Sequence, residues 1–138
     1  MPAKDIYHDN VKNCLVKDSW TITHDPLRLQ WGQRDLYVDL GAERLLAAEK
    51  AGRKIAVEIK SFIGASILAD LEQALGQYLL YHHILSDTEP ERKLYIAVKH
   101  SVFKELFDGP IGKALLEKNN IQLMVFDPKQ EEIIRWTP

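Results

Sequence analysis

A long helical segment between two apolar strand segments is the feature of this 138-residue chain that most limits its fold. Residues 54–62 and 93–99 alternate apolar side chains with others, which is the two-residue period of a β-strand. Between them, residues 66–85 carry an apolar stripe at helical spacing, formed by Ile67, Leu71, Leu75, Tyr78, Leu79 and His82. Strand, helix and strand in this order predict a mixed sheet with helices packed on it and a right-handed crossover.

The remaining segments add strands and helices on both sides of this unit. A hairpin is predicted around Ala51-Gly52-Arg53, joining a strand over 44–49 to the strand that begins at residue 54. The other predicted elements are a first helix at 4–17, strand segments at 20–24, 27–31 and 36–40, short helices at 102–107 and 110–118, and closing strands at 121–126 and 132–136. This order predicts one α/β (α+β) domain over residues 1–138, with an αβββαβ core and a C-terminal α/β extension.

The composition excludes several classes of protein. Apolar runs are as short as Ile55-Ala56-Val57, far below the ~18–20 residues of a membrane span, so we expect no membrane association. The first residues lack the apolar stretch of a secretory signal. A single cysteine, Cys14, excludes an internal disulfide and a cysteine-rich metal site. We expect a cytoplasmic, reducing setting.

The net charge of −2 argues against a protein that coats nucleic acid generally, because such proteins have a pI above ~9. Contact with DNA through a local basic patch, the groove of a homo-oligomer or a partner protein is compatible with this charge. An acidic metal site would itself lower the overall charge.

The strand segment at 54–60 carries the most informative polar residues. Because side chains alternate between the faces of a strand, Glu58 and Lys60 share one face, and the β-branched residues of the segment share the other. Buried charges need partners, since burial of an isolated charge is costly. The pair is either an ion pair at a strand end or on a solvated face, or part of a functional site.

An aspartate upstream of the hairpin supports the functional interpretation. Asp39, in Val38-Asp39-Leu40-Gly41, can direct its carboxylate toward Glu58 if a strand ends there. Two carboxylates with a carbonyl and waters form a site suited to Mg²⁺. Lys60 would then orient the attacking water or stabilise charge on a phosphate. The alternative for Asp39 is a turn-capping role, and Asp35 and Glu43 are rivals for the ligand position.

The predicted long helix has a polar stripe beside its apolar one. Its members at steps of three and four are Ser66, Asp70, Gln73, Gln77 and Tyr81. The stripe contains few of the Lys and Glu residues that usually fill exposed faces, so it can line the Glu58 and Lys60 site. A solvated helix face is the alternative.

The histidines give weaker signals. His8 and Asp9 in the first helix either approach the site from its other side or form a surface pair. His82 falls on the apolar stripe and fits a core histidine better than a metal ligand. No zinc-ligand spacing, glycine-rich phosphate loop or G-x-S-x-G turn occurs.

An aspartate followed by Glu-x-Lys on a strand, in a helix–strands–helix–strand order, resembles the PD-(D/E)XK nuclease superfamily. The corresponding residues, with the QxxxY motif of RecB-like members included, are Asp39, Glu58, Lys60, Gln77 and Tyr81. The resemblance implies a restriction-endonuclease-like core and a catalytic site in which Asp39 and Glu58 hold Mg²⁺. An acidic position in the first helix of many members falls near His8 or Asp9.

A closer resemblance covers nearly the whole chain. The chain is similar to the XisH family, called the fdxN element excision controlling factor, in Pro2-Ala3-Lys4-Asp5, His8-Asp9, Thr23-His24-Asp25-Pro26, Val38-Asp39-Leu40-Gly41-Ala42-Glu43, residues 55–62 and Leu75-Gly76-Gln77-Tyr78. The resemblance implies a role in programmed DNA excision in heterocyst-forming cyanobacteria. It implies as partners DNA, a site-specific recombinase and a small companion, XisI.

Two functions follow from these resemblances. One is a non-catalytic controlling factor that uses a nuclease-like fold to bind DNA, a recombinase or XisI, and the modest negative charge favours it. The other is an active Mg²⁺-dependent endonuclease, favoured because every charged position of the motif is filled. We expect the first, with the nuclease-like site retained.

Overall fold

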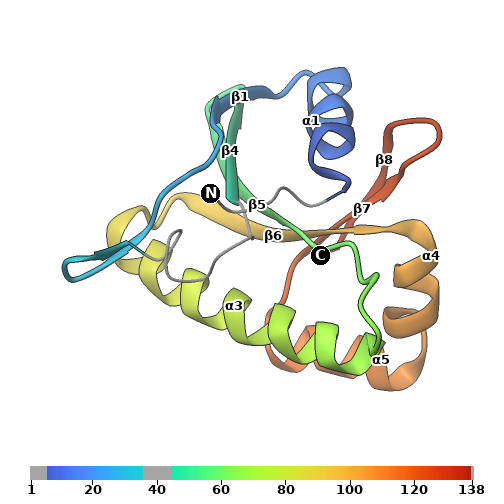
Figure 1. Cartoon of the computed structure of the whole chain (residues 1–138). Helices are drawn as coiled ribbons and strands as arrows, with labels where there is room; N and C mark the ends of the chain where they lie inside the picture. Colours follow the sequence, from blue (N-terminus) through green and yellow to red (C-terminus); the bar gives the residue numbers. More distant parts are fainter. Residues whose placement is uncertain (1–5, 36–44, 138) are drawn as a thin grey trace.

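A six-stranded mixed sheet with helices on both faces runs through the computed structural model, which describes residues 6–35 and 45–137 (Figure 1). The order across the sheet is β1 (Thr21–His24), β4 (Leu45–Lys50), β5 (Arg53–Ile59), β6 (Arg92–Lys99), β7 (Leu123–Asp127) and β8 (Glu132–Thr137). Strands β5, β6 and β7 are parallel to one another, and the other neighbouring pairs are antiparallel. The predicted mixed sheet is therefore confirmed, whereas the strand expected at 36–40 lies outside the described residues.

The hairpin between β4 and β5 has the predicted turn. Ala51 and Gly52 both have positive φ angles, of 50° and 82°, as a two-residue turn with the twist of the flanking strands requires. Lys50 pairs with Arg53 at the turn, and Leu45 pairs with Glu58 at the far end of the hairpin. The turn chemistry thereby sets the register that brings Glu58 next to Leu45.

Helix α3 (Ile67–Thr88) connects the parallel strands β5 and β6, as predicted. Ser66 begins the helix, and its hydroxyl accepts a hydrogen bond from the Ala69 N–H at 3.2 Å. The helix continues past Leu85, where the apolar pattern predicted its end, to Thr88. Within the described ranges, no helix has both the length and the apolar character needed to cross a bilayer.

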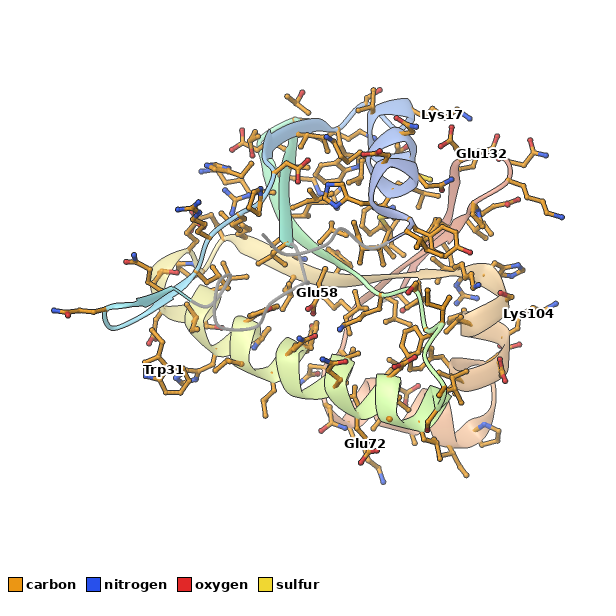
Figure 2. All side chains as sticks on the ribbon, in the orientation of Figure 1. Lys17, Trp31, Glu58, Glu72, Lys104 and Glu132 are labelled. Atoms are coloured by element: carbon orange, nitrogen blue, oxygen red, sulfur yellow. The ribbon has the colours of Figure 1, made fainter. Side chains whose placement is uncertain are left out.

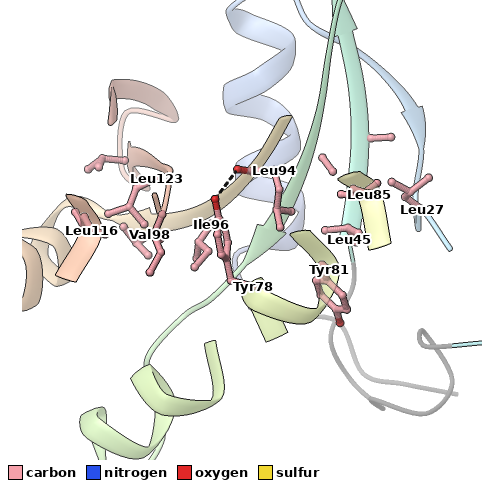
Figure 3. Close-up of a cluster of buried hydrophobic side chains, with 14 of the residues drawn as sticks. Leu27, Leu45, Tyr78, Tyr81, Leu85, Leu94, Ile96, Val98, Leu116 and Leu123 are labelled. Carbon is pink, nitrogen blue, oxygen red and sulfur yellow. Dashed lines mark hydrogen bonds between the residues drawn. The ribbon is translucent and has the colours of Figure 1, made fainter. Parts of the chain in front are cut away.

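Each face of the sheet has its own apolar core. Helix α1 (His8–Lys17) covers one face through Val11, Cys14 and Leu15, and α3 covers the other. Figure 3 shows Tyr78 and Tyr81 entering the α3-side core from successive turns. Strand β5 alternates between these cores: Ile55, Val57 and Ile59 face α1, and Ala56 faces α3.

The apolar stripe predicted for α3 is wrong in part. Leu79 is 71% exposed, and His82 is exposed, although both were expected to face the core. The buried residues of α3 are Ala74, Gln77, Tyr78, Tyr81, Ile84 and Leu85. The helix is turned so that part of its polar stripe meets the sheet face that also carries a buried acid and a lysine. His82 stacks on the Tyr78 ring, with 5.8 Å between ring centroids.

The C-terminal extension returns the chain to the sheet through three short helical segments, where helices at 102–107 and 110–118 were expected. They are α4 (His100–Val102), the π-helix η1 (Phe103–Phe107) and α5 (Pro110–Lys118). Gly112 of α5 lies so close to η1 that a Cβ there would collide with the Leu106 carbonyl oxygen and lie 2.5 Å from Phe107 Cα. Only glycine permits this approach.

A short ribbon of two strands lies outside the main sheet. Strands β2 (Gln30–Trp31) and β3 (Arg34–Asp35) pair only with each other in the described part of the chain. The alternation expected over 27–31 is partly realised, because Leu27 and Leu29 are buried, but only the last two residues form a strand. Figure 1 shows the ribbon extending away from the six-stranded sheet.

Candidate functional site

Strand β5 places Glu58 and Lys60 on the face of the sheet that α3 covers. Both follow Ala56 at even spacing, and Ala56 belongs to the α3-side core. Glu58 is fully buried between its strand neighbours Leu45 and Ile96. Figure 2 shows it in the layer between the sheet and α3.

Lys60 directly follows the last residue of β5. Its backbone N–H donates to the Ala97 carbonyl at 3.1 Å, which extends the pairing with β6 by one hydrogen bond. The residue is only 5% exposed, although lysine is almost never buried to this extent without a partner. Burial of both Glu58 and Lys60 excludes the solvated-face interpretation of this pair.

Helix α3 contributes Gln77 and Tyr81, one turn apart and both buried, at 7% and 5% exposure. Within the described residues, Gln77 Oε1 is buried and has no hydrogen-bond donor. A buried acceptor left without a donor costs about 1–3 kcal/mol. Such an oxygen is suited to receive a water, a ligand donor or a cation.

A pocket of about 160 Å³ opens where β5 leads into α3. Lys60, Asp70 and Gln73 line it together with the loop at 61–64. The Gly64 N–H donates to Asp70 Oδ2 at 2.9 Å and thereby ties this loop to the first turn of α3. Asp70 and Gln73 of the polar stripe therefore line the same pocket as Lys60, whereas Glu58, Gln77 and Tyr81 are not among its lining residues.

The second carboxylate of the expected metal site stays a prediction. Asp39 and its rival Glu43 lie outside the described residues, as does the side chain of the other rival, Asp35. Among the residues that are described, no three His, Cys, Asp or Glu side chains gather as a metal-binding cluster. The Glu58 carboxylate and the Gln77 amide oxygen, both buried, are each of the oxygen type that Mg²⁺ takes as a ligand.

The first helix approaches the sheet from the opposite face. His8 is 1% exposed, and its Nε2 lies 2.9 Å from Asp25 Oδ1, so the expected surface pair of His8 with Asp9 is wrong. Lys12, one turn further along α1, places its Nζ 2.8 Å from Asp25 Oδ2. Burial acts to raise the pKa of Asp25, but the hydrogen bonds from Lys12 and His8 outweigh it and hold that pKa below its ordinary value.

The cluster of His8, Lys12 and Asp25 was not predicted from the sequence. In the sequence, Asp25 is noted only within Thr23-His24-Asp25-Pro26, one of the segments similar to the XisH family, and its distance along the chain from His8 hides the contact. Asp25 precedes Leu27, whose N–H bonds to the carbonyl of Leu45, the partner of Glu58 across the hairpin. The cluster therefore lies toward the same end of the sheet as Glu58 but on the α1 side.

Comparisons with known proteins agree with one another. A family model described as XisH protein matches residues 1–134. The structure is similar to that of an XisH family protein from Nostoc punctiforme, with 38% identity, a TM-score of 0.88 and coverage of 97% of this chain and 100% of the other. It is also similar to a fdxN element excision controlling factor protein from Anabaena variabilis, with 38% identity, a TM-score of 0.87 and coverage of 97% and 99%. Among curated proteins, no sequence matches.

Proposed function

Because this chain belongs to the XisH family, we propose that it is an accessory factor that controls the programmed excision of a DNA element by site-specific recombination. The observation that carries the proposal is the similarity over nearly the whole chain to a protein named as an excision controlling factor. Its partners in this role are DNA, a recombinase and an XisI-like companion, in the cytoplasm of a cell that forms heterocysts. A homo-oligomer would supply a wider DNA-binding groove than one chain.

The proposal includes a nuclease-like site of the PD-(D/E)XK type. Three features support it: a hairpin strand that carries Glu58 and ends just before Lys60, a helix that is the next element of the chain, and a parallel strand after that helix. Gln77 and Tyr81 of this helix are buried on the side that faces the sheet. Asp39 completes the motif in sequence.

In this site, Glu58, Asp39 and the Gln77 amide oxygen would hold Mg²⁺. Bound there, the ion would neutralise phosphate charge and make a coordinated water more acidic. Lys60 offers a positive charge next to the open pocket, where a phosphate oxygen of DNA can bind. Asp70 fixes the loop after Lys60 through Gly64 and keeps this charge in place.

The accessory role is tested by excision in cells that carry Glu58→Ala together with Lys60→Ala. We expect excision to continue, because a controlling factor needs the surface of the fold and not hydrolysis. The purified variant must first show the circular dichroism spectrum of the parent, since both residues are buried. Loss of excision by a folded variant would favour the catalytic function.

A second candidate function is Mg²⁺-dependent DNA cleavage. The burial of Glu58 together with a lysine beside an open pocket favours it, because a purely structural pair needs no such opening. Nicking of a supercoiled plasmid with Mg²⁺ or Mn²⁺ tests it directly. Cleavage that Glu58→Gln abolishes would establish the enzyme, and absence of nicking at protein excess would leave the accessory role alone.

A further inference from the structure

Helix α3 has an uncovered leucine and an open notch on the side turned away from the sheet. Leu79 is 71% exposed there. Gly76, one turn earlier, is also exposed, and a Cβ added to it would meet no other part of the described chain within 4 Å. Beside these two residues, a groove of about 280 Å³ lies between α3 and α5, with Leu75 and Leu115 among its lining residues.

This side of α3 forms a continuous face, which we call the α3 outer face. Its members follow one another at steps of three and four and are all exposed: Leu68, Glu72, Gly76, Leu79 and His83. Figure 2 shows Glu72 on the side of α3 away from the sheet. A single exposed leucine is ordinary on a surface, but here it adjoins a notch and an apolar groove, which is typical of a docking surface.

The charge of the α3 outer face favours a protein partner over DNA. Helix α3 contains no lysine or arginine, although these residues usually fill exposed helix positions. Contacts to DNA depend on such cations, and Glu72 repels phosphate. The occupant of this face must therefore offer an apolar side chain for the notch and a group that pairs with a carboxylate.

The α3 outer face supplies both of these groups itself. When two copies of a helix lie antiparallel about a two-fold axis, residues equally far from the axis on its two sides lie opposite each other. An axis midway between residues 76 and 79 places Leu79 of each copy against Gly76 of the other. The same axis places Glu72 opposite His83, whose imidazole N–H can donate to the carboxylate. A face that is complementary to its own reverse indicates a second copy of this chain.

We propose that two copies of this chain associate through the α3 outer face, with Leu79 of each copy seated in the Gly76 notch of the other and Glu72 paired with His83. The contact needs neither DNA nor a metal ion, so it goes beyond the proposed function and does not depend on it. Asp70 and Gln73, which line the Lys60 pocket, are not part of this face, and the pocket stays open in the dimer. An interface built mainly on one helix from each copy is small, so we expect micromolar affinity.

Sedimentation equilibrium of the full-length protein at increasing concentration tests the association. The average mass should rise from 15.9 kDa toward twice that value. Leu79→Glu should weaken the association by roughly 30-fold or more, because it places a carboxylate in an apolar notch twice in each dimer. Val16→Glu is the matched control and should change nothing, since Val16 is 59% exposed on α1, which covers the opposite face of the sheet.

Gly76→Leu tests the notch without a change of charge. In a single copy the new side chain has open space, so in dilute solution the variant should fold and be at least as stable as the parent. In the dimer the new side chain occupies the place of Leu79 from the other copy, and we expect the association to weaken by roughly tenfold or more. Unchanged association of Gly76→Leu would overturn the proposed seat of Leu79.

An exchange of charges tests the antiparallel pairing. Glu72→Lys and His83→Glu should each weaken the association by about 2- to 10-fold, because each removes the favourable pair at two symmetric positions. The double variant restores an opposite-charge pair in both places and should recover most of the affinity. Both residues are exposed, so the folded monomer should tolerate these changes. A double variant no stronger than the single variants would overturn the antiparallel arrangement.

Two further results would count against the dimer. A parent protein that remains monomeric over the whole concentration range would overturn the proposal, whichever other protein then binds the α3 outer face. A dimer that Leu79→Glu leaves intact would show that the copies meet through a different surface. Neither result bears on the excision role, because that role is measured by excision in cells.

Discussion

His8 of helix α1 contacts Asp25 after strand β1, with Nε2 2.9 Å from Oδ1. Lys12 adds a cationic partner to the same carboxylate, with its Nζ 2.8 Å from Oδ2. The three residues connect the first helix to the turn from which the chain runs on to the ribbon and its buried base. The cluster therefore couples the position of α1 to the end of the sheet that carries Glu58.

Low pH should reduce the stability of the folded protein in part because Asp25 becomes protonated. Because the pKa of Asp25 is lowered from its ordinary 3.8, its contribution to stability is fully present above that value and is lost as pH falls through the lower folded pKa. Asp25→Asn should therefore destabilise the protein by about 1–3 kcal/mol at neutral pH and flatten its acid response. Urea unfolding at pH 7, 5 and 3 measures both effects. A difference in unfolding free energy between the parent and Asp25→Asn that stays constant with pH would contradict the lowered pKa of Asp25.

The contact between α5 and the π-helix should make Gly112 intolerant of a side chain. Gly112→Ala forces a methyl group against backbone atoms of Leu106 and Phe107, and we expect a loss of about 1–3 kcal/mol in unfolding free energy. Gly76→Ala is the matched control, because Gly76 lies in α3 with no atom near its added Cβ. That control should stabilise the protein by about 0.5–1 kcal/mol through helix propensity. Thermal denaturation should thus show shifts of opposite sign, and parallel shifts would rule out the close approach.

The Tyr78 hydroxyl joins α3 to the chain before β7. It lies 3.2 Å from the Asn120 carbonyl, 3.5 Å from the Leu94 carbonyl and accepts from the Gln122 N–H at 3.2 Å, and Figure 3 shows the Leu94 contact. Burial of this hydroxyl raises its pKa. Tyr78→Phe should cost about 1–3 kcal/mol because backbone groups lose their partner.

Tyr95→Phe is the control for this prediction. Tyr95 is equally buried, at 4% exposure, but its hydroxyl has no hydrogen-bond partner in the part of the chain that the structure describes. We expect a change below about 0.5 kcal/mol, the range of substitutions that disturb no such feature. Chemical denaturation measures the unfolding free energy of both variants. If Tyr78→Phe and Tyr95→Phe lose equal amounts of it, the stabilising role of the Tyr78 hydroxyl is refuted.

Binding of Mg²⁺ should stabilise the folded protein through Glu58. A ligand that binds only the folded state raises stability by about 2.7 kcal/mol at a hundredfold excess over its dissociation constant. We expect the melting temperature of the parent to rise with Mg²⁺ and to fall back when EDTA removes it, and Glu58→Gln to abolish both shifts. Glu105→Gln, which changes an exposed glutamate on η1, should leave the metal response intact. If Mg²⁺ does not change the melting temperature of the parent protein, the proposal that Glu58 binds this ion is refuted.

Local periodicity alone determined the crossover unit, the β4–β5 hairpin and the common face of Glu58 and Lys60. These features depend on the two-residue period of strands, the 3.6-residue period of helices and the chemistry of a turn such as Ala51-Gly52, all of which act between neighbours in the chain. The main candidate site residues of β5 and α3 could therefore also be selected from the sequence.

Only the tertiary structure decided which face of α3 is buried and which partner His8 takes. The sequence pattern favoured an apolar stripe with Leu79 and His82, but packing against β5 and β6 buried Gln77 and Tyr81 in its place. Asp25 reaches His8, and Trp31 stays in solvent, because the sheet brings together segments that are distant along the chain. Such contacts depend on how elements dock, and a periodic pattern within one element holds no information about its neighbour in space.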